Sequence, residues 1–388
     1  MRWIDVELGE FADITAGVSP PGSNILESPG QLPFHQGTRD FGSMYPSHRV
    51  YCEEAPRIAN KEDILISVRA PIGRINVAPC KIGIGRGLMS LRTRQGLDQN
   101  YLYYVLISYE DRWTEYESAG SVFANLGKSD LASLQISLPP LTEQRGIAAT
   151  LGALDDKIES NRRVIEKLDT LFHSKWESLY ESDSCSTEVL LADIVTTQYG
   201  ITASAKFDGN GIKLVRVTDI NKANWINWDA VPNVEVSQRD NEKYHLRKGD
   251  LMVARMADPG KSAIFDDEAV PAVFASYLVR LQTSSYEDSL FLFGFLKSKH
   301  YLDYAQAAMS GSVQKNMNAR VIVNTQLRWP LPVALNSFAK EAQLLRMTLN
   351  SRLREIETLA SLRDTLLPEL LSGRVRVPEA IEAVEEVL

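Results

Sequence analysis

The sequence repeats itself at an offset close to half the length of the chain. Gly-Ser-Val at 120–122 recurs at 311–313, an offset of 191 residues. Upstream, DILISVRAPIG at 63–73 resembles DLMVARMADPG at 250–260, an offset of 187 residues. A period of this length fills nearly all of the 388 residues. We therefore predict two tandem copies of one structural unit.

A long amphipathic segment follows the unit in each copy. LPPLTEQRGIAATLGALDDKIESNRRVIEKL at 138–168 opens with two prolines, which predict a helix that begins at Thr142 and runs to about Tyr180. We predict that the second helix begins near Asn336 or Ser337 and weakens at Pro368. The apolar residues recur every 3.5 residues on average, as in a heptad seam, and keep one phase in both copies: Ile147, Leu151, Leu154, Ile158, Ile165, Leu168 and Phe172, then Ala342, Leu345, Leu349, Ile356 and Leu359.

A polar residue interrupts the seam at the same place in both copies, Asn161 in the first and Arg352 in the second. The shared phase and shared interruption predict that the two helices pair with each other as an antiparallel coiled coil. The alternative is two independent amphipathic helices, each packed on its own domain.

The remaining segments carry short strand-like runs separated by turns rich in proline and glycine, and each ends in one helical pattern. We predict an α/β (α+β) chain with an internal pseudo-twofold repeat. Its expected parts are domain 1 (1–138), a central spacer helix (139–183), domain 2 (184–332), a C-terminal spacer helix (333–376) and an acidic tail (377–388).

The charge distribution is uneven. The net charge is −8, which speaks against a polyanion-binding surface over the whole molecule. Two zones are nevertheless basic, one from Arg57 to Arg94, which includes Arg86, and one from Lys297 to Arg328. They predict two restricted faces for a polyanion, with ordinary solvated surface as the alternative.

A search for catalytic chemistry gives nothing. The three cysteines form no CxxC pair and the five histidines have no metal-ligand spacing. PGKSA at 259–263 lacks the first glycine of a phosphate loop, since Arg255 stands there. SPPG at 19–22 lacks the aromatic residue that would stack a flipped base. We predict no catalytic residue, no metal and no cofactor.

Two long motifs carry a family resemblance that covers essentially the whole chain: LPPLTEQRGIAATLGALDDKIESNRRVIEKLDTL and LRDTLLPELLSGRVRV. The sequence resembles the specificity subunit of a Type I restriction-modification system. The resemblance implies two target-recognition domains that each read half of a split sequence in double-stranded DNA, with no catalysis by the subunit itself. It also implies a coiled coil that spaces those domains and docks two methyltransferase subunits, which a translocating restriction subunit can join. The second helix departs from the pattern, because ALNSF replaces LTEQ, and this puts equal docking of both methyltransferases in doubt.

The candidate DNA-contacting residues rest on side-chain chemistry and on the repeat. All are cationic or amide side chains in loops after strands or beside the Gly-Ser-Val segment, where they can reach phosphates or base edges. They are Arg39, Arg69, Arg74, Arg86, Lys128, Arg216, Arg255, Lys261, Lys315, Asn316, Asn318 and Arg320.

On the first long helix, Glu143, Gln144 and Arg145 are the candidate partner-docking residues of its outer face. The apolar runs are too short to cross a bilayer, so we expect a cytoplasmic protein without a membrane partner. Three alternatives remain open: a related methyltransferase system without a translocating partner, a tandem-repeat scaffold that never touches DNA, and a fused methyltransferase or nuclease.

Overall fold

The structure is a computed structural model that describes residues 3–26, 31–109, 113, 125–207, 209–310 and 316–387. Its contacts divide the chain into two compact units. Unit 1 comprises Met1–Lys157 and Leu359–Leu388, and unit 2 comprises Ile158–Thr358. Both divisions fall inside a long helix, whereas the sequence suggested boundaries at the helix ends. The five-part division therefore stays a prediction.

Unit 1 is a mixed α/β unit built on an antiparallel sheet. The strand order of this sheet is β2 (Ala12–Ala16), β10 (Leu88–Thr93), β7 (Ile64–Ser67), β8 (Ile75–Val77). A second sheet has the order β3 (Ile25–Leu26), β5 (Tyr51–Cys52), β4 (Leu32–His35), β9 (Ile82–Ile84), β6 (Ile58–Ala59). β1 (Ile4–Glu7) pairs with β11 (Gln135–Leu138), which returns the chain to its start. The helices are α1 (Leu8–Phe11), α2 (Gln99–Ile107), α4 (Lys128–Ala132), α13 (Val377–Glu385) and the 3-10 turns η1 (Gly22–Asn24) and η2 (Thr38–Asp40).

Unit 2 repeats this plan. Its main sheet has the order β13 (Thr196–Tyr199), β19 (Leu278–Gln282), β16 (Leu251–Ala254), β17 (Ser262–Ile264), and its second sheet the order β15 (Asn233–Val234), β14 (Ile212–Val215), β18 (Ala272–Phe274). β12 (Cys185–Leu190) pairs with β20 (Gln326–Pro330) as β1 pairs with β11. The helices are α6 (Leu191–Ile194), α7 (Val217–Ile220), α8 (Gln238–Tyr244), α9 (Tyr286–Lys297), α10 (Lys299–Ser310), α11 (Ala319–Val323) and the 3-10 turn η3 (Trp228–Ala230). The predicted repeat and the mixed α/β class are confirmed.

The two long helices are α5 (Leu141–Tyr180) and α12 (Pro332–Leu371), each of 40 residues. The bounds predicted for α5 are confirmed. The start predicted for α12 is wrong, because α12 begins at Pro332, where proline suits the first turn and gives up no helical hydrogen bond. Nor does α12 end at Pro368, which lies inside it between the buried residues Leu367 and Leu370.

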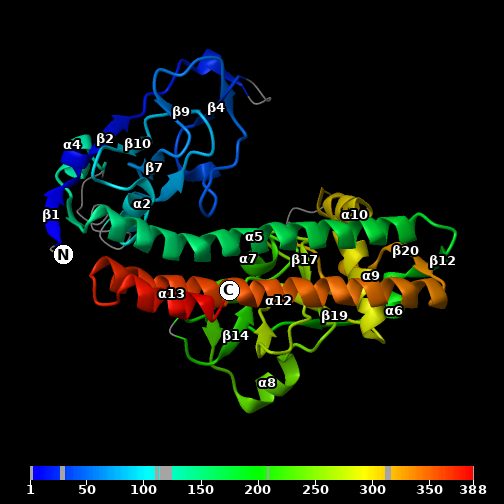
Figure 1. The fold of residues 1–388 in the computed structure, drawn as a ribbon. Helices are drawn as coiled ribbons and strands as arrows, with labels where there is room; N and C mark the ends of the chain where they lie inside the picture. Colours follow the sequence, from blue (N-terminus) through cyan, green and yellow to red (C-terminus); the bar gives the residue numbers. More distant parts are fainter. Residues whose placement is uncertain are drawn as a thin grey trace. The chain divides into compact units, whose positions relative to one another are not determined.

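The helices run antiparallel to each other within each unit (Figure 1). In unit 1, Arg363 of α12 pairs with Asp155 of α5 at 2.7 Å. In unit 2, Lys175 of α5 pairs with Glu341 of α12, and the rings of Phe172 and Phe338 lie 5.8 Å apart. The predicted seam on α5 is buried at Ile147, Leu151, Leu154, Ile158, Ile165 and Phe172. The predicted antiparallel coiled coil is confirmed.

The polar interruption of the seam differs between the two helices. Asn161 is buried, and its Nδ2 has no hydrogen-bond partner in the described part of the chain. Arg352 is partly exposed and forms an ion pair with Glu355 on its own helix. The two positions match in sequence, but only Asn161 places a desolvated polar group in the seam.

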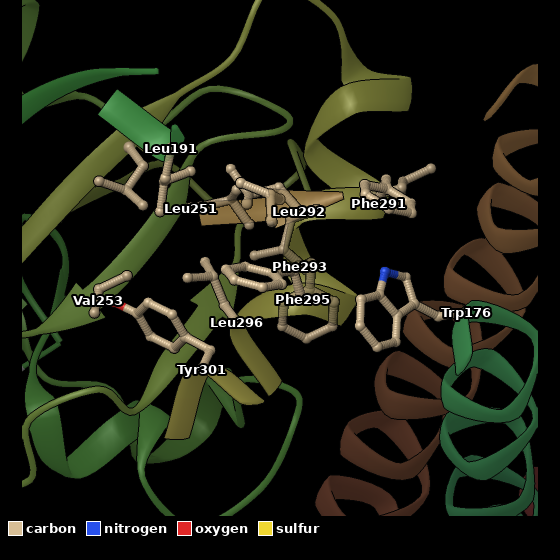
Figure 2. Packing of buried hydrophobic residues seen from close by; sticks show 14 of the residues in the cluster. Trp176, Leu191, Leu251, Val253, Phe291, Leu292, Phe293, Phe295, Leu296 and Tyr301 are labelled. Atoms are coloured by element: carbon tan, nitrogen blue, oxygen red, sulfur yellow. The ribbon is translucent and has the colours of Figure 1, made fainter. Parts of the chain in front are cut away.

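An aromatic cluster forms the largest part of the unit 2 core (Figure 2). Phe291, Phe293 and Phe295 of α9 are fully buried, and Trp176 projects toward them from α5. The ring centroids of Trp176 and Phe291 are 5.9 Å apart. This burial of aromatic surface joins α5 to the domain of unit 2 and stabilises both.

The acidic tail is helical over α13. Ala380 and Val384 of α13 are buried, and Arg376, the residue before the helix, pairs with Glu143 of α5 at 3.3 Å. The tail therefore folds back onto the beginning of α5 within unit 1.

Candidate nucleic-acid interface

The same strand-turn-strand element occurs in both units, between β7 and β8 and between β16 and β17. Gly73 and Gly260 have φ values of 80° and 87°, a conformation that favours glycine. Their backbone N–H groups donate to the carbonyls of Ser67 and Ala254 at 2.9 and 3.0 Å. The turn presents an exposed cation directly after the glycine in each unit, Arg74 in unit 1 and Lys261 in unit 2.

The segment that follows each Gly-Ser-Val sequence docks onto the end of the strand before this turn. Leu126 donates its backbone N–H to the carbonyl of Val68 at 3.1 Å, and Met317 donates to the carbonyl of Arg255 at 2.9 Å. Leu126 and Met317 are themselves buried. The Gly-Ser-Val residues and Lys315 lie outside the described residues. The repeat therefore fixes one backbone frame around the turn.

The register of this frame shows that Arg255 is equivalent to Val68, whereas Arg69 is equivalent to Met256. The two arginines do follow equivalent strands, but they stand one residue apart. Arg69 is exposed, while Arg255 is partly buried in a position where unit 1 has a buried valine.

Arg255 is held by an aromatic side chain that the sequence gave no reason to select. Its guanidinium lies over the ring of Tyr199 at 4.9 Å from the centroid. The hydroxyl of Tyr199 accepts a hydrogen bond from the backbone N–H of Ala319 at 2.9 Å. Tyr199 is at the end of β13, so only the sheet pairing brings it to Arg255. Cation–π contact orients the guanidinium without using its hydrogen-bond donors.

The three described candidates from 316 to 320 lie beside Arg255 but differ in what they can do. Asn316 has a buried Oδ1 that lacks a partner among the described residues. Asn318 is the N-cap of α11, and its side chain accepts from the backbone N–H of Val321 at 3.0 Å. The expectation of a bidentate adenine contact by Asn318 is therefore wrong, since its oxygen already caps a helix. Arg320 is exposed on α11.

The other candidate cations are distributed over both units. Arg39, Arg86 and Lys128 are exposed in unit 1. Arg216 follows β14 in unit 2, but it is engaged, because it forms a two-point contact with the buried carboxylate of Asp219 at 2.9 and 3.0 Å. Its guanidinium also lies over the exposed ring of Phe207.

Part of the basic charge counted in the sequence serves the fold. Arg92 pairs with Asp63, and Arg94 with Asp13. Arg328 donates to the carbonyl of Tyr180 at 2.6 Å, at the C-terminal end of α5, where cations are favoured. These arginines are poorly placed to contact a polyanion.

The comparisons with known proteins bear on this frame. Residues 2–170 match the family model described as Type I restriction modification DNA specificity domain. Residues 2–170 form a domain of this family. A type I restriction enzyme MjaX specificity subunit of Methanocaldococcus jannaschii is 41% identical over 43% of this chain and 40% of its own length, so that match spans less than half of the relative. The MjaVIII specificity subunit of the same organism is 22% identical over 97% of this chain and 93% of its own.

The fold of the whole chain is similar to a solved structure. The crystal structure of the Type-I restriction-modification system S subunit from M. genitalium superimposes with a TM-score of 0.63 at 18% identity, covering 95% of this chain and 96% of the other. The specificity domain is thus one half of a chain whose complete fold resembles that S subunit.

In the specificity domain, the three candidate docking residues on α5 have three different environments. Gln144 is 1% exposed, so its placement on the outer face is wrong. Its amide accepts from the backbone N–H of Asp98 and donates to the carbonyls of Gly96 and Pro139, which fastens the start of the helix to α2. Glu143 is largely covered by its pair with Arg376, and Arg145 is exposed.

Two further searches concern the described residues only. They contain no group of three or more histidine, cysteine or acidic side chains that could hold a metal ion. Among them no helix combines the length and apolar character needed to span a bilayer.

Proposed function

We propose that this chain is the DNA sequence-recognition subunit of a Type I restriction-modification complex. It reads an asymmetric site in two parts through two target-recognition domains, residues 1–138 and 184–332. The helical parts, 139–183 and 333–376, space these domains, and 377–388 is the acidic tail. The chain does no chemistry of its own and scaffolds two methyltransferase subunits, which a restriction subunit can join.

One observation carries the proposal. The strand-turn element has the same backbone frame in both units, while its side chains differ, with Val68 in one and Arg255 in the other at one position. A common frame with divergent presented side chains is what two different half-sites require, because base edges are distinguished by side-chain chemistry. The specificity-domain match over residues 2–170 supports the same assignment for unit 1.

The test is a selection from random DNA duplexes by the purified chain together with its methyltransferase, over a range of salt concentrations. We expect enrichment of one bipartite sequence, with an affinity that falls as salt rises. Enrichment of no sequence would contradict the proposal and favour a scaffold that does not touch DNA. Methyl transfer by the isolated chain would contradict its non-catalytic role.

A second test concerns the spacer helices. A heptad inserted into both α5 and α12 adds roughly 10 Å to the helical pair at 1.5 Å per residue. We expect the spacer of the selected sequence to lengthen by about three base pairs at about 3.4 Å each. An unchanged spacer would contradict the role of the helices as a ruler, while leaving DNA recognition intact.

A further inference from the structure

A pocket of about 250 Å³ lies in unit 2 between α5, the end of α9, the turn before β17 and the segment after α7. Four lysines line it: Lys222, Lys261, Lys297 and Lys299. Lys299 pairs with Asp303, whereas Lys222 and Lys261 are exposed and form no ion pair within the described part of the chain. Glu177 is the acidic residue among the described residues of the lining. The pocket therefore has a clear excess of positive charge.

Two buried hydrogen-bond donors in the lining have no partner. Ser262 is 0% exposed and Trp176 is 2% exposed, yet neither the hydroxyl of Ser262 nor Nε1 of Trp176 bonds to any described residue. Buried polar groups are nearly always paired, and an indole N–H can only donate. The missing partner of Trp176 must therefore be an acceptor, which a bound anion supplies.

Lys297 joins these donors. Its ammonium lies over the ring of Phe293 at 5.5 Å and donates to the backbone carbonyl of Ser262. Burial lowers the pKa of Lys297 to about 7. Asp169 opposes this shift, whereas Lys261 and Arg346 add to it. A negative group in the pocket would favour the charged form of Lys297 and would be favoured by it in turn.

Unit 1 has a pocket at the equivalent place, lined by Gly73, Arg74, Ile75, Tyr103 and Ile107 among others. By the repeat, Ile75 stands where unit 2 has Ser262, and Ile107 stands where it has Lys297. Both pockets share the frame, but only unit 2 fills it with a buried hydroxyl and a buried ammonium. The polar lining is therefore a property of unit 2 and does not follow from the fold alone.

A local exchange creates room for the indole. Gly294 of α9 replaces Tyr104 of α2 at the equivalent position, and a Cβ on Gly294 would come within 2.2 Å of Trp176. The absent side chain lets Trp176 pack flat on α9 with its N–H at the pocket (Figure 2).

We propose that this pocket of unit 2 binds a phosphate group, with Lys261 and Lys297 as its cations and the Ser262 hydroxyl and Trp176 indole N–H as neutral donors. Lysine is a common phosphate ligand, and a phosphate offers enough acceptor oxygens for all four groups. The inference does not depend on sequence-specific DNA recognition, since the phosphate can belong to a DNA backbone or to a free ligand.

The test is a titration of the full chain with inorganic phosphate against chloride at equal ionic strength, followed by the side-chain NMR signal of Lys297. We expect saturable binding, a rise in the pKa of Lys297, and affinity reduced roughly tenfold in Lys297→Met, as for loss of one charge-assisted hydrogen bond. Lys340→Met removes the same charge from an exposed position of α12 and should bind as the wild type does. Ser262→Ala, a smaller change, should weaken binding if Lys297→Met does not fold.

Absence of saturable binding, or equal binding by both pocket variants and Lys340→Met, would overturn the proposal. A second arm identifies the source of the phosphate by adding a random-sequence duplex. Competition between duplex and inorganic phosphate that disappears in Lys297→Met assigns the site to the DNA backbone. Simultaneous binding of both assigns it to a free ligand. Failure of sequence selection with intact phosphate binding would count against the proposed function and leave this site standing.

Discussion

Asp155 and Arg363 fasten the two long helices together within unit 1. Oδ1 of Asp155 accepts from Nη1 of Arg363 at 2.7 Å, and Oδ2 accepts from the hydroxyl of Tyr104 at 2.7 Å. One carboxylate thus joins α5, α12 and α2. In unit 2, Arg346 of α12 donates to Asp266 at 2.6 Å, and position 346 is equivalent by the repeat to position 155. Each unit has a buried ion pair there, with the sign of the helix residue reversed.

We expect Asp155→Ala to lower the free energy of unfolding by about 3 kcal/mol, since removal of one partner leaves a largely buried guanidinium and a phenol unpaired. The matched control is Asp364→Ala, which removes the other carboxylate on Arg363, one that is 62% exposed, and should cost less than about 1 kcal/mol. Urea unfolding of the full chain measures both. Equal losses would contradict the role assigned to Asp155.

Gln144→Ala should destabilise unit 1 by about 2 kcal/mol, because buried backbone groups of Gly96, Asp98 and Pro139 lose their partner. Arg145→Ala, at the adjacent position with a side chain that is 67% exposed, should change stability by less than about 0.5 kcal/mol. Thermal unfolding compares them. If Gln144→Ala matches the stability of the wild type but loses the methyltransferase subunit, the sequence-based docking assignment was right and the structural role is wrong.

His35 makes the stability of unit 1 dependent on pH. Burial and the neighbouring His48 lower its pKa to about 4. In the unfolded chain the pKa is about 6.5, so between these values the unfolded state binds a proton that the folded state does not. The free energy of unfolding should therefore fall as the pH falls from about 6.5 to 4, by up to about 3 kcal/mol. Urea unfolding over this range should show a shallower slope for His35→Gln. An unchanged slope would contradict this prediction.

Arg255→Met should weaken binding of the specific duplex by roughly ten- to a hundredfold and relax base preference in one half-site only. Tyr199 already orients the guanidinium, so little ordering cost opposes the contact. Lys340→Met, which removes an exposed charge on α12, controls for the change in net charge. A uniform loss over both half-sites would mean that Arg255 contacts phosphate instead of bases.

The sequence predicted what local pattern encodes. The prolines at 139 and 140 and the heptad seam gave the bounds and the buried face of α5, and the offsets of 187 and 191 gave the repeated frame. The start of α12 was misjudged, because Asn336 and Ser337 resemble an N-cap, whereas burial of Leu335 and Phe338 extends the helix to Pro332. Propensity yields to packing in that case.

Contacts between distant segments were beyond the reach of the sequence. Gln144 is polar and lies off the apolar seam, so nothing local indicates that it is buried. Asn318 has the chemistry of an adenine reader and of a helix cap, and only the backbone of α11 decides between them. Tyr199 meets Arg255 through the pairing of β13 with β19 and of β19 with β16, which no spacing in the chain reveals.

Sequencing of the methylated bases in cells that express this chain with its methyltransferase tests the central claim most directly. The account predicts one methylated motif made of two specific half-sites separated by an unspecific spacer, lost when the chain is deleted. Exchange of residues 184–332 for those of another specificity subunit should replace one half-site and keep the other. A continuous motif, or methylation that is unchanged without this chain, would contradict recognition by two separate domains.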